Sequence, residues 1–166
     1  TTVNVAATPQ PAQFGVPIEA VVTVATVAPA AGAPTGTVDV IEAGNTLGTI
    51  TVGVSGQATF PLTDLPAGTS TITFAYSGDA RYAASTGTTT ITVTTASTSV
   101  SVTGSPNPVT FPDGFQVRVP VTSSSGSIPT GYVAVSVDGT HEVYAAIDYA
   151  GVAYASINRP AGTYEI

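Results

Sequence analysis

The chain has 166 residues, ten of them acidic and three basic, and its formal net charge at pH 7 is −7. The three basic residues are all arginine, and cysteine is absent. So few cations cannot neutralise a row of phosphates, which excludes nucleic-acid binding and disfavours an anionic membrane surface. No apolar run approaches the roughly 18 residues of a membrane-spanning helix. Without disulfides, a secreted fold of this composition depends on packing alone.

The composition favours an all-β chain. Thr, Val and Ala are abundant, and 17 glycines and 13 prolines supply turns. β-Branched residues suit a pleated, half-buried surface, and no segment has a helical period. A hydrophobic fraction of 43% is enough for packed cores. The sequence starts at Thr1 rather than at Met, so we expect a processed product or a segment of a longer protein.

In the first 95 residues, large apolar side chains repeatedly occupy every second position. This is the period of a half-buried strand, because successive side chains point to opposite faces. Pro9 and Pro11 end the first run, as expected at a sheet edge, since proline donates no ladder hydrogen bond. The predicted strands are a first one around Val3 and Val5, and then residues 18–24, 36–41, 47–52, 58–62, 69–76 and 88–94.

The last two of these strands flank the segment Tyr76–Tyr82, which contains a Ser-Gly-Asp turn. We expect the two strands to form a hairpin that closes a β-sandwich. Gly78 suits the turn, and the Asp79 carboxylate is expected to accept backbone N–H groups of its own turn. Tyr76 and Tyr82 are expected to hold the hairpin to the sandwich, each with its ring inward and its hydroxyl on a backbone carbonyl.

Comparing the chain with itself indicates two copies of one module, residues 1–95 and 96–166. The joining segment, residues 93–100, has no Gly or Pro, which predicts a short, stiff connection. The offset between the residue numbers of matching segments changes by one or two residues, and these changes fall in loops, as expected after a duplication. The repeated segments are Thr8–Pro11 with Ser105–Pro108 (105 − 8 = 97), Pro34–Gly36 with Pro129–Gly131 (129 − 34 = 95) and Pro66–Thr69 with Pro160–Thr163 (160 − 66 = 94).

The second copy departs from the first at its end. Its last residues, Thr163–Ile166, correspond to Thr69–Ile72, so the turn and the final strand have no counterpart. We expect the protein to continue beyond Ile166; the alternative is that a neighbouring subunit supplies the strands, as in donor-strand assembly. Within this copy, Asp113-Gly114 and Asp138-Gly139 are predicted hairpin turns.

The second copy is also the richer in tyrosine. Tyr154 aligns with Phe60 at an offset of 94 and is predicted to be a core residue. Tyr132 replaces the outward-facing Thr37, and Tyr149 lies near a turn. Tyr132 and Tyr149 are therefore candidates for a contact surface, either for a sugar ring or for another subunit.

No group of residues predicts catalysis or a metal site, and we expect no cofactor. His141 is the only histidine, which is too few for a typical zinc site without cysteine. It is predicted to be a surface or strand-end residue. A hydrolase would need this histidine beside an exposed, shaped serine turn, and the sequence has no such motif. Asp39, Asp64 and Asp79 are calcium candidates by charge alone. We therefore expect a protein that is not an enzyme.

The order and spacing of several short motifs resemble those of the bacterial immunoglobulin-like repeat domain family, over about the first 95 residues. The motifs are Pro34–Val38, Leu47–Thr49, Leu65–Thr69, Tyr76–Asp79 and Tyr82–Ser85. The resemblance implies two tandem immunoglobulin-like β-sandwiches, the second lacking its last strands as given.

The same resemblance implies an extracellular or cell-surface location. The implied role is structural: a stalk or repeat region of a bacterial surface protein or adhesin, or a filament subunit. The implied partners are similar modules or subunits, with surface glycans as a further possibility. A carbohydrate-binding module and a phage virion decoration domain are the alternatives.

Overall fold

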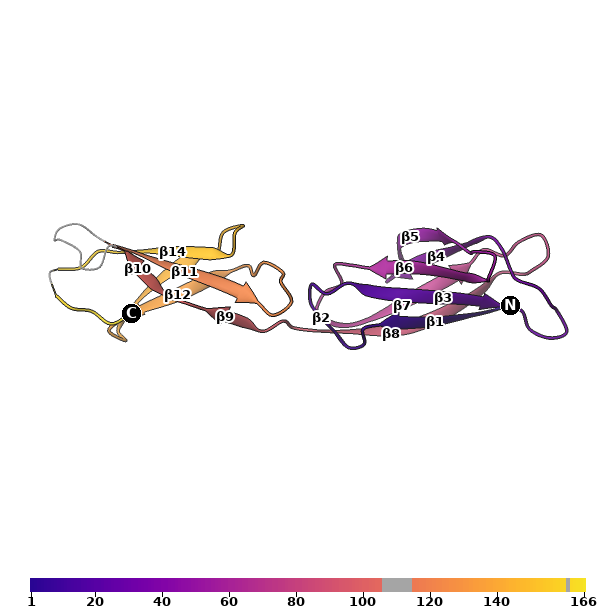
Figure 1. Ribbon diagram of the computed structural model, residues 1–166, viewed down its shortest axis with the longest axis horizontal. Helices are drawn as coiled ribbons and strands as arrows, with labels where there is room; N and C mark the ends of the chain where they lie inside the picture. Colours follow the sequence, from indigo (N-terminus) through magenta and orange to yellow (C-terminus); the bar gives the residue numbers. More distant parts are fainter. Residues whose placement is uncertain (106–114, 161) are drawn as a thin grey trace. The chain divides into compact units, whose positions relative to one another are not determined.

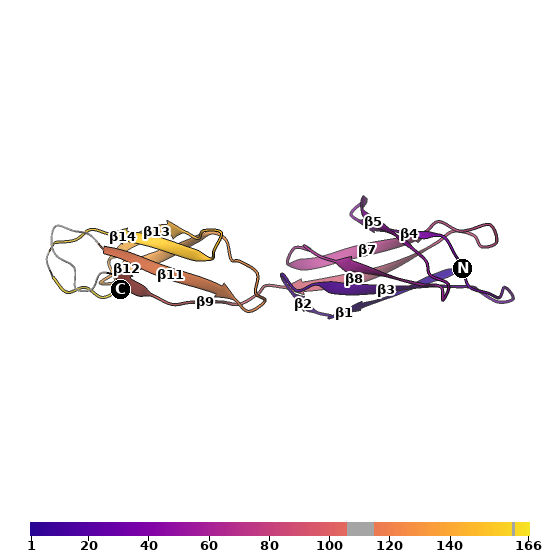
Figure 2. The ribbon, with the colours of Figure 1, turned by 45° about the horizontal axis from the view of Figure 1, so that its top comes forward.

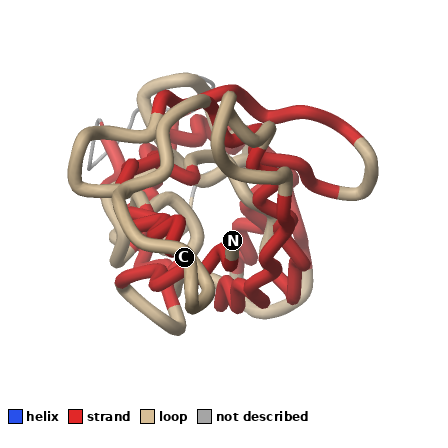
Figure 3. The backbone as a smooth tube through the Cα atoms, turned by 90° about the vertical axis from the view of Figure 1, so that its right-hand side faces the viewer, coloured by secondary structure: helices blue, strands red, loops and turns tan. Residues whose placement is uncertain are grey.

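The computed structural model describes residues 1–105, 115–160 and 162–166, and it contains only strands and loops in that part of the chain (Figure 1, Figure 3). The all-β prediction is confirmed. The chain divides into two compact units, Thr1–Thr95 and Ala96–Ile166. No helix of the described residues is long and apolar enough to cross a membrane.

Unit 1 is a sandwich of two sheets (Figure 2). Within the second sheet, β2 (Ala12–Gln13) runs parallel to β8 (Ser85–Thr94), and all other neighbouring strands are antiparallel. The first sheet has the order β1 (Thr2–Thr8), β3 (Ile18–Ala25), β6 (Gln57–Leu62). The second has the order β2 (Ala12–Gln13), β8 (Ser85–Thr94), β7 (Gly68–Tyr76), β4 (Thr37–Glu42), β5 (Asn45–Thr51).

The predicted strands of unit 1 are all present, with shifts at their ends. The hairpin of β7 and β8 pairs Gly68 with Val93 and Tyr76 with Ser85. The largest shift is at β8, which begins at Ser85 rather than at residue 88. Strand β2 was not predicted from the sequence, because two residues after a pair of prolines are too few to show any periodicity.

The core of unit 1 lies between the sheets and follows the alternation of the strands. Each fully buried Val, Leu, Ile or Phe contributes about 1.5–3 kcal/mol. Phe74 is 0% and Tyr76 2% exposed, and these are the largest fully buried side chains. Around them lie Ile18, Ala20, Val22, Val24, Val38, Val40, Leu62, Ile72, Ile91 and Val93.

Unit 2 repeats part of this arrangement. The Asp138-Gly139 turn joins β12 (Tyr132–Val137) to β13 (His141–Ala146), and its two residues have positive φ angles of 51° and 67°, as predicted for a hairpin. The Asp113-Gly114 turn lies outside the described residues. One sheet contains β10 (Thr103–Ser105), β11 (Phe115–Ser123) and β14 (Val152–Ile157), with β9 (Thr98–Val100) also paired to β11. The other pairs β12 (Tyr132–Val137) with β13 (His141–Ala146).

The register of unit 2 corrects the prediction for Tyr154. Val22 pairs with Ala58 in unit 1, and Val119 pairs with Ala153 in unit 2, so the offset at β14 is 153 − 58 = 95. The counterpart of Phe60 is therefore Ala155. Tyr154 is 45% exposed rather than buried. An error of one residue in the offset moves a side chain to the opposite face of a strand.

The last residues of unit 2 lie beside the turn between β12 and β13. The Asp138 N–H donates to the Glu165 carbonyl at 2.9 Å, and the Glu165 N–H donates to the Asp138 carboxylate at 2.8 Å. In unit 1, Glu42 of β4 pairs with Ile72 of β7. Asp138 corresponds to Ala43 (138 − 43 = 95) and Glu165 to Thr71 (165 − 71 = 94), which are the residues next to that pair in the same register, so Glu165 occupies the place that the alignment of Thr163–Ile166 with Thr69–Ile72 gives it.

Candidate functional site

The turn between β7 and β8 is organised by one carboxylate. Oδ1 of Asp79 accepts the N–H groups of Arg81 at 2.7 Å and Tyr82 at 2.9 Å. The Asp79 N–H donates in turn to the Tyr82 carbonyl at 2.9 Å. Gly78 has a φ of 81°, which only glycine adopts without strain. The sequence predicted this use of Asp79 from the Ser-Gly-Asp pattern.

The same turn also holds the loop that precedes β4, which lies about 40 residues earlier in the chain. Oδ2 of Asp79 accepts both the N–H and the hydroxyl of Thr35, each at 2.8 Å. The Tyr76 hydroxyl donates to the Thr35 carbonyl, and the Tyr82 hydroxyl donates to the Ala31 carbonyl at 2.7 Å. The two tyrosines and Asp79 therefore fasten the Ala31–Thr35 loop to the hairpin, which is a structural role.

These contacts shift two pKa values. Hydrogen bonds from the Thr35 and Arg81 backbones hold the pKa of Asp79 well below its usual range. Burial, together with the nearby Asp79 charge, raises the pKa of Tyr76. Both residues therefore keep one protonation state near neutral pH, and neither is poised to transfer protons.

In unit 2 both predicted contact residues are exposed. Tyr132 begins β12 and is 76% exposed. Tyr149 is 92% exposed and lies in the turn before β14, where Oδ1 of Asp148 accepts the Ala150 and Val152 N–H groups at 2.8 and 2.9 Å. The strand register does not pair Tyr132 with Tyr149.

The register instead places Tyr132 beside Tyr144, which is 66% exposed. Tyr132 pairs with Ala146 and Tyr144 pairs with Ala134, so the two tyrosines are diagonal neighbours on the outer face, roughly 7–8 Å apart. The two small alanines leave both rings uncovered. We call this face, Tyr132, Ala134, Tyr144 and Ala146, the tyrosine face. The alternation of residues 132–137 and 141–146 around the Asp138-Gly139 turn was the signal for it in the sequence.

The tyrosine face carries one charge. The Tyr144 hydroxyl donates to the Glu142 carboxylate at 2.5 Å, and this bond raises the pKa of Tyr144. Flat aromatic rings with an adjacent hydrogen-bonding group can stack on apolar or sugar surfaces.

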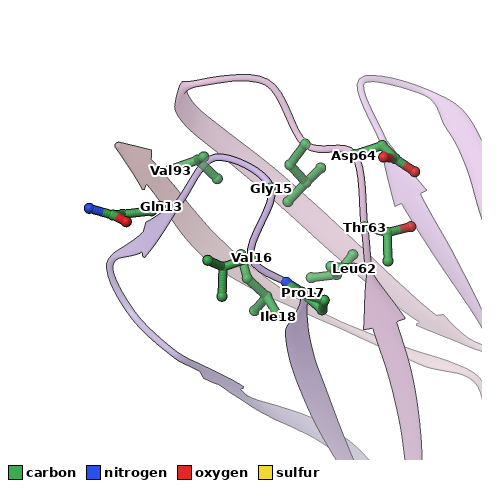
Figure 4. Close-up of a pocket in the computed structure, with 10 residues that line it drawn as sticks. Gln13, Gly15, Val16, Pro17, Ile18, Leu62, Thr63, Asp64 and Val93 are labelled. Carbon is green, nitrogen blue, oxygen red and sulfur yellow. The ribbon is translucent and has the colours of Figure 1, made fainter. Parts of the chain in front are cut away.

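Unit 1 has a hollow of about 310 Å³ between the Gln13–Ile18 and Leu62–Leu65 segments (Figure 4). Its lining is mostly apolar, with Val16, Ile18 and Leu62 among the residues labelled there. Asp64 is the single ionisable residue of the lining. One carboxylate does not provide the acid and base pair that a hydrolytic site needs.

The remaining candidates for chemistry are dispersed. Asp39 accepts the Thr49 hydroxyl at 2.6 Å, Asp64 lines the hollow and Asp79 lies in the turn. Within the described residues, no three His, Cys, Asp or Glu side chains gather to hold a metal ion. Strand β13 begins at His141, as the strand-end prediction required, but its side chain lies outside the described part.

The strand order of unit 1, with β1-β3-β6 facing β2-β8-β7-β4-β5, defines an immunoglobulin-like β-sandwich. Residues 5–96, which are 92 of the 166, match the family described as bacterial Ig-like domain (group 3), and the chain belongs to that family. The predicted resemblance is confirmed. No curated protein matches the chain. Ig-like domains of bacteria are structural or interaction modules, generally without catalytic activity and typically found in surface or extracellular proteins.

Proposed function

We propose that this chain is a non-catalytic part of the stalk or repeat region of a bacterial surface protein or adhesin. The observation that carries the proposal is the path of the chain through unit 1. Because β1 and β2 follow β8 in the same direction, the chain enters this sandwich at one end and leaves it at the other. A module with this path adds length between the segments that precede and follow it.

The family and the internal repeat also support a stalk. The match to bacterial Ig-like domains covers unit 1, and unit 2 repeats its β3–β6 and β4–β5 pairings. The negative net charge of −7 suits a surface that stays in solution without sticking to its copies. A filament subunit remains a form of the same structural role, with other copies of the chain as partners.

A carbohydrate-binding module is the second candidate, and the tyrosine face favours it. Tyr132 and Tyr144 present two exposed rings as diagonal neighbours on one face of the β12–β13 sheet, and sugar rings can stack on such rings. Tyr149, in the turn before β14, is a further exposed ring.

Three measurements separate these roles. Antibodies raised against the chain should label intact cells of the source bacterium if it forms a surface stalk, and labelling only after permeabilisation would contradict that. Light scattering should show monomers for a stalk and concentration-dependent assembly for a filament. A glycan array should show no binding for a stalk.

If the array does show binding, two variants identify the surface. Tyr132→Ala and Tyr144→Ala should each abolish binding if the tyrosine face holds the sugar. Tyr154→Ala is the matched control, because Tyr154 is also exposed but lies on β14, in the other sheet of unit 2. Binding lost equally in all three variants would contradict the assignment to the tyrosine face.

A further inference from the structure

The first 14 residues of unit 1 follow β8 along its whole length. At one end, the Thr1 hydroxyl bonds to the Ala83 carbonyl at 2.7 Å and to the Ser85 hydroxyl at 2.8 Å. At the other end, Gln13 pairs with Thr94. The residue numbers of the partners on β8 increase along with those of the first segment. The two segments are therefore parallel from end to end (Figure 1).

The middle of this contact depends on a side chain. Gln10 lies between Pro9 and Pro11, which have no N–H group to donate to a ladder. Its side-chain amide donates to the Thr90 carbonyl at 3.2 Å, and its Oε1 accepts the Thr92 N–H at 3.1 Å. Gln10 thus supplies both a donor and an acceptor to β8 where the backbone supplies neither.

The far end is closed by backbone bonds. Ala12 pairs with Val93, and the Phe14 N–H donates to the Thr94 carbonyl at 2.8 Å. The Thr94 hydroxyl donates to the Ala12 carbonyl at 3.2 Å. Phe14 marks the last residue of the contact, since the next backbone bond, from Val16, goes to Gln13 in its own loop.

A glycine allows the first segment to approach β8 closely. A Cβ atom at Gly87 would overlap the carbonyl group of Val3. Val3 is itself buried in the core and pairs with Val24 on the other side. The first strand is therefore held between β3 and β8, and any movement along its own axis must break contacts with both.

The direction of these contacts determines how they respond to tension. Force that enters the chain before β1 and leaves it after β8 pulls the two segments in opposite directions along their axes. Hydrogen bonds perpendicular to that direction all carry the force together, whereas strands peeled apart from one end lose their bonds one at a time. The seven pairs from Thr2 to Thr8 between β1 and β3 are loaded in the same way.

We propose that the contact between Thr1–Phe14 and β8 is a shear clamp that makes unit 1 resist tension, and that Gln10 is the residue that holds its middle. The purpose of such a clamp rests on the proposed stalk role, since a stalk transmits force between a cell and its attachment. The clamp itself is a property of unit 1 and can be measured without knowledge of that role.

The test stretches the full chain between handles at its two ends, at constant force. Unfolding of unit 1 is recognised by its length, because it contains 95 residues against 71 in unit 2. Gln10→Ala should raise the unfolding rate of unit 1 about 5-fold, the factor that corresponds to a net loss of about 1 kcal/mol. An unchanged rate would overturn the role of Gln10.

Gln57→Ala is the matched control. Gln57 is also exposed, and its amide donates to the Thr23 hydroxyl at 3.3 Å, but it joins β6 to β3, and neither strand is the first or the last of the unit. Its removal should leave the rate under force within about 2-fold of the unsubstituted chain. Equal acceleration by both variants would contradict a clamp located at Gln10.

The direction of pulling provides a second test. The chain has no cysteine, so Ala80→Cys creates a single attachment point in the exposed turn near Thr1. Force applied between the N-terminus and residue 80 acts on one end of the unit and peels the first strand away. Unfolding should then occur at a lower force than between the two ends. Equal forces in the two geometries would overturn the clamp.

These results are separable from those that test the stalk. Glycan binding or assembly into filaments would contradict the stalk role and leave the forces of unit 1 unchanged. Equal forces in both pulling directions would remove the clamp and leave a stalk that works under little tension.

Discussion

Two strand pairings of unit 1, β3–β6 and β4–β5, recur in unit 2 as β11–β14 and β12–β13, but the two units differ in the aromatic residues of their cores. Val22 with Ala58 in unit 1 and Val119 with Ala153 in unit 2 occupy equivalent places. Unit 1 then fills its centre with Phe74 and Tyr76. In unit 2 the tyrosines at 132, 144 and 154 are exposed, the buried core contains mainly Val and Ala, and Phe115 and Tyr164 pack against it only partly buried.

The shared pairings show that one strand register accommodates side chains of very different size, since Ala155 of unit 2 occupies the place of Phe60 in unit 1. Period-2 alternation determines which face of a strand is buried, and small and large apolar residues both satisfy it. The free energy from burial differs, because it scales with the apolar area removed from water. We therefore expect unit 1 to be the more stable unit.

Among the substitutions that shorten a side chain, the largest effect should come from Phe74→Ala. The ring is fully buried in unit 1, so its removal should lower the free energy of unfolding of that unit by about 3–5 kcal/mol. Val119→Ala should instead lower the stability of unit 2, by about 2 kcal/mol. Denaturant unfolding followed by NMR signals of each unit measures both. A loss shared equally between the units would show that they do not unfold separately.

A smaller difference should separate two tyrosine hydroxyls. Tyr76→Phe leaves the Thr35 carbonyl without its donor and should cost about 1–3 kcal/mol in unit 1. Tyr144→Phe removes an exposed bond to Glu142 and should change the stability of unit 2 by less than about 0.5 kcal/mol. If thermal unfolding showed equal losses of stability for the two variants, burial of Tyr76 would not strengthen the contribution of its hydroxyl hydrogen bond.

Acid should weaken unit 1 through Asp79. Its pKa is depressed in the folded state, so its contribution is complete above the unfolded value of about 3.9 and is lost as the pH falls below it. Asp79→Asn should reduce the stability of unit 1 at pH 7 and make it less dependent on pH between 5 and 2. Urea midpoints at several pH values measure this. Parallel pH profiles for the two proteins would contradict it.

The smallest effect is expected at Tyr154. Because it lies on the outer face of β14, Tyr154→Ala should change the stability of unit 2 by less than about 0.5 kcal/mol. Ala155→Asp, at the buried position next to it, should prevent unit 2 from folding, since it places an unpaired charge in the core. A large loss of stability from Tyr154→Ala would instead support the predicted equivalence of Tyr154 with Phe60.

Much of the fold could be predicted from alternation and turn residues. The strands of unit 1, the β7–β8 hairpin and the Asp79 bonds to its own turn are local features, because they involve neighbours in sequence. The hydrogen bond that the Thr35 N–H donates to Asp79 joins residues 44 apart in the chain, and no local sequence pattern predicts it. The predicted burial of Tyr154 was wrong because the alignment changed the offset from 95 to 94 before β14, whereas in the structure this one-residue difference in loop length falls after β14.

The contact surface was harder to predict than the core. Tyr132 and Tyr149 are exposed as expected, but Tyr144 was not predicted as a neighbour of Tyr132, because diagonal pairing depends on the register across the Asp138-Gly139 turn. The alternation of a strand reveals which residues are buried in the core, but it does not reveal which exposed residues of two strands become neighbours. The same limit applies to β2, where the parallel pairing with β8 follows from tertiary packing alone.

The path of the chain through unit 1 has a consequence for how such genes change. Because the points where the chain enters and leaves lie at opposite ends of the sandwich, a whole copy can be inserted in series without altering any packed interior. Recombination between repeated coding segments then adds or removes modules in single steps. A family built on this path can vary in reach between strains while every module keeps its own fold.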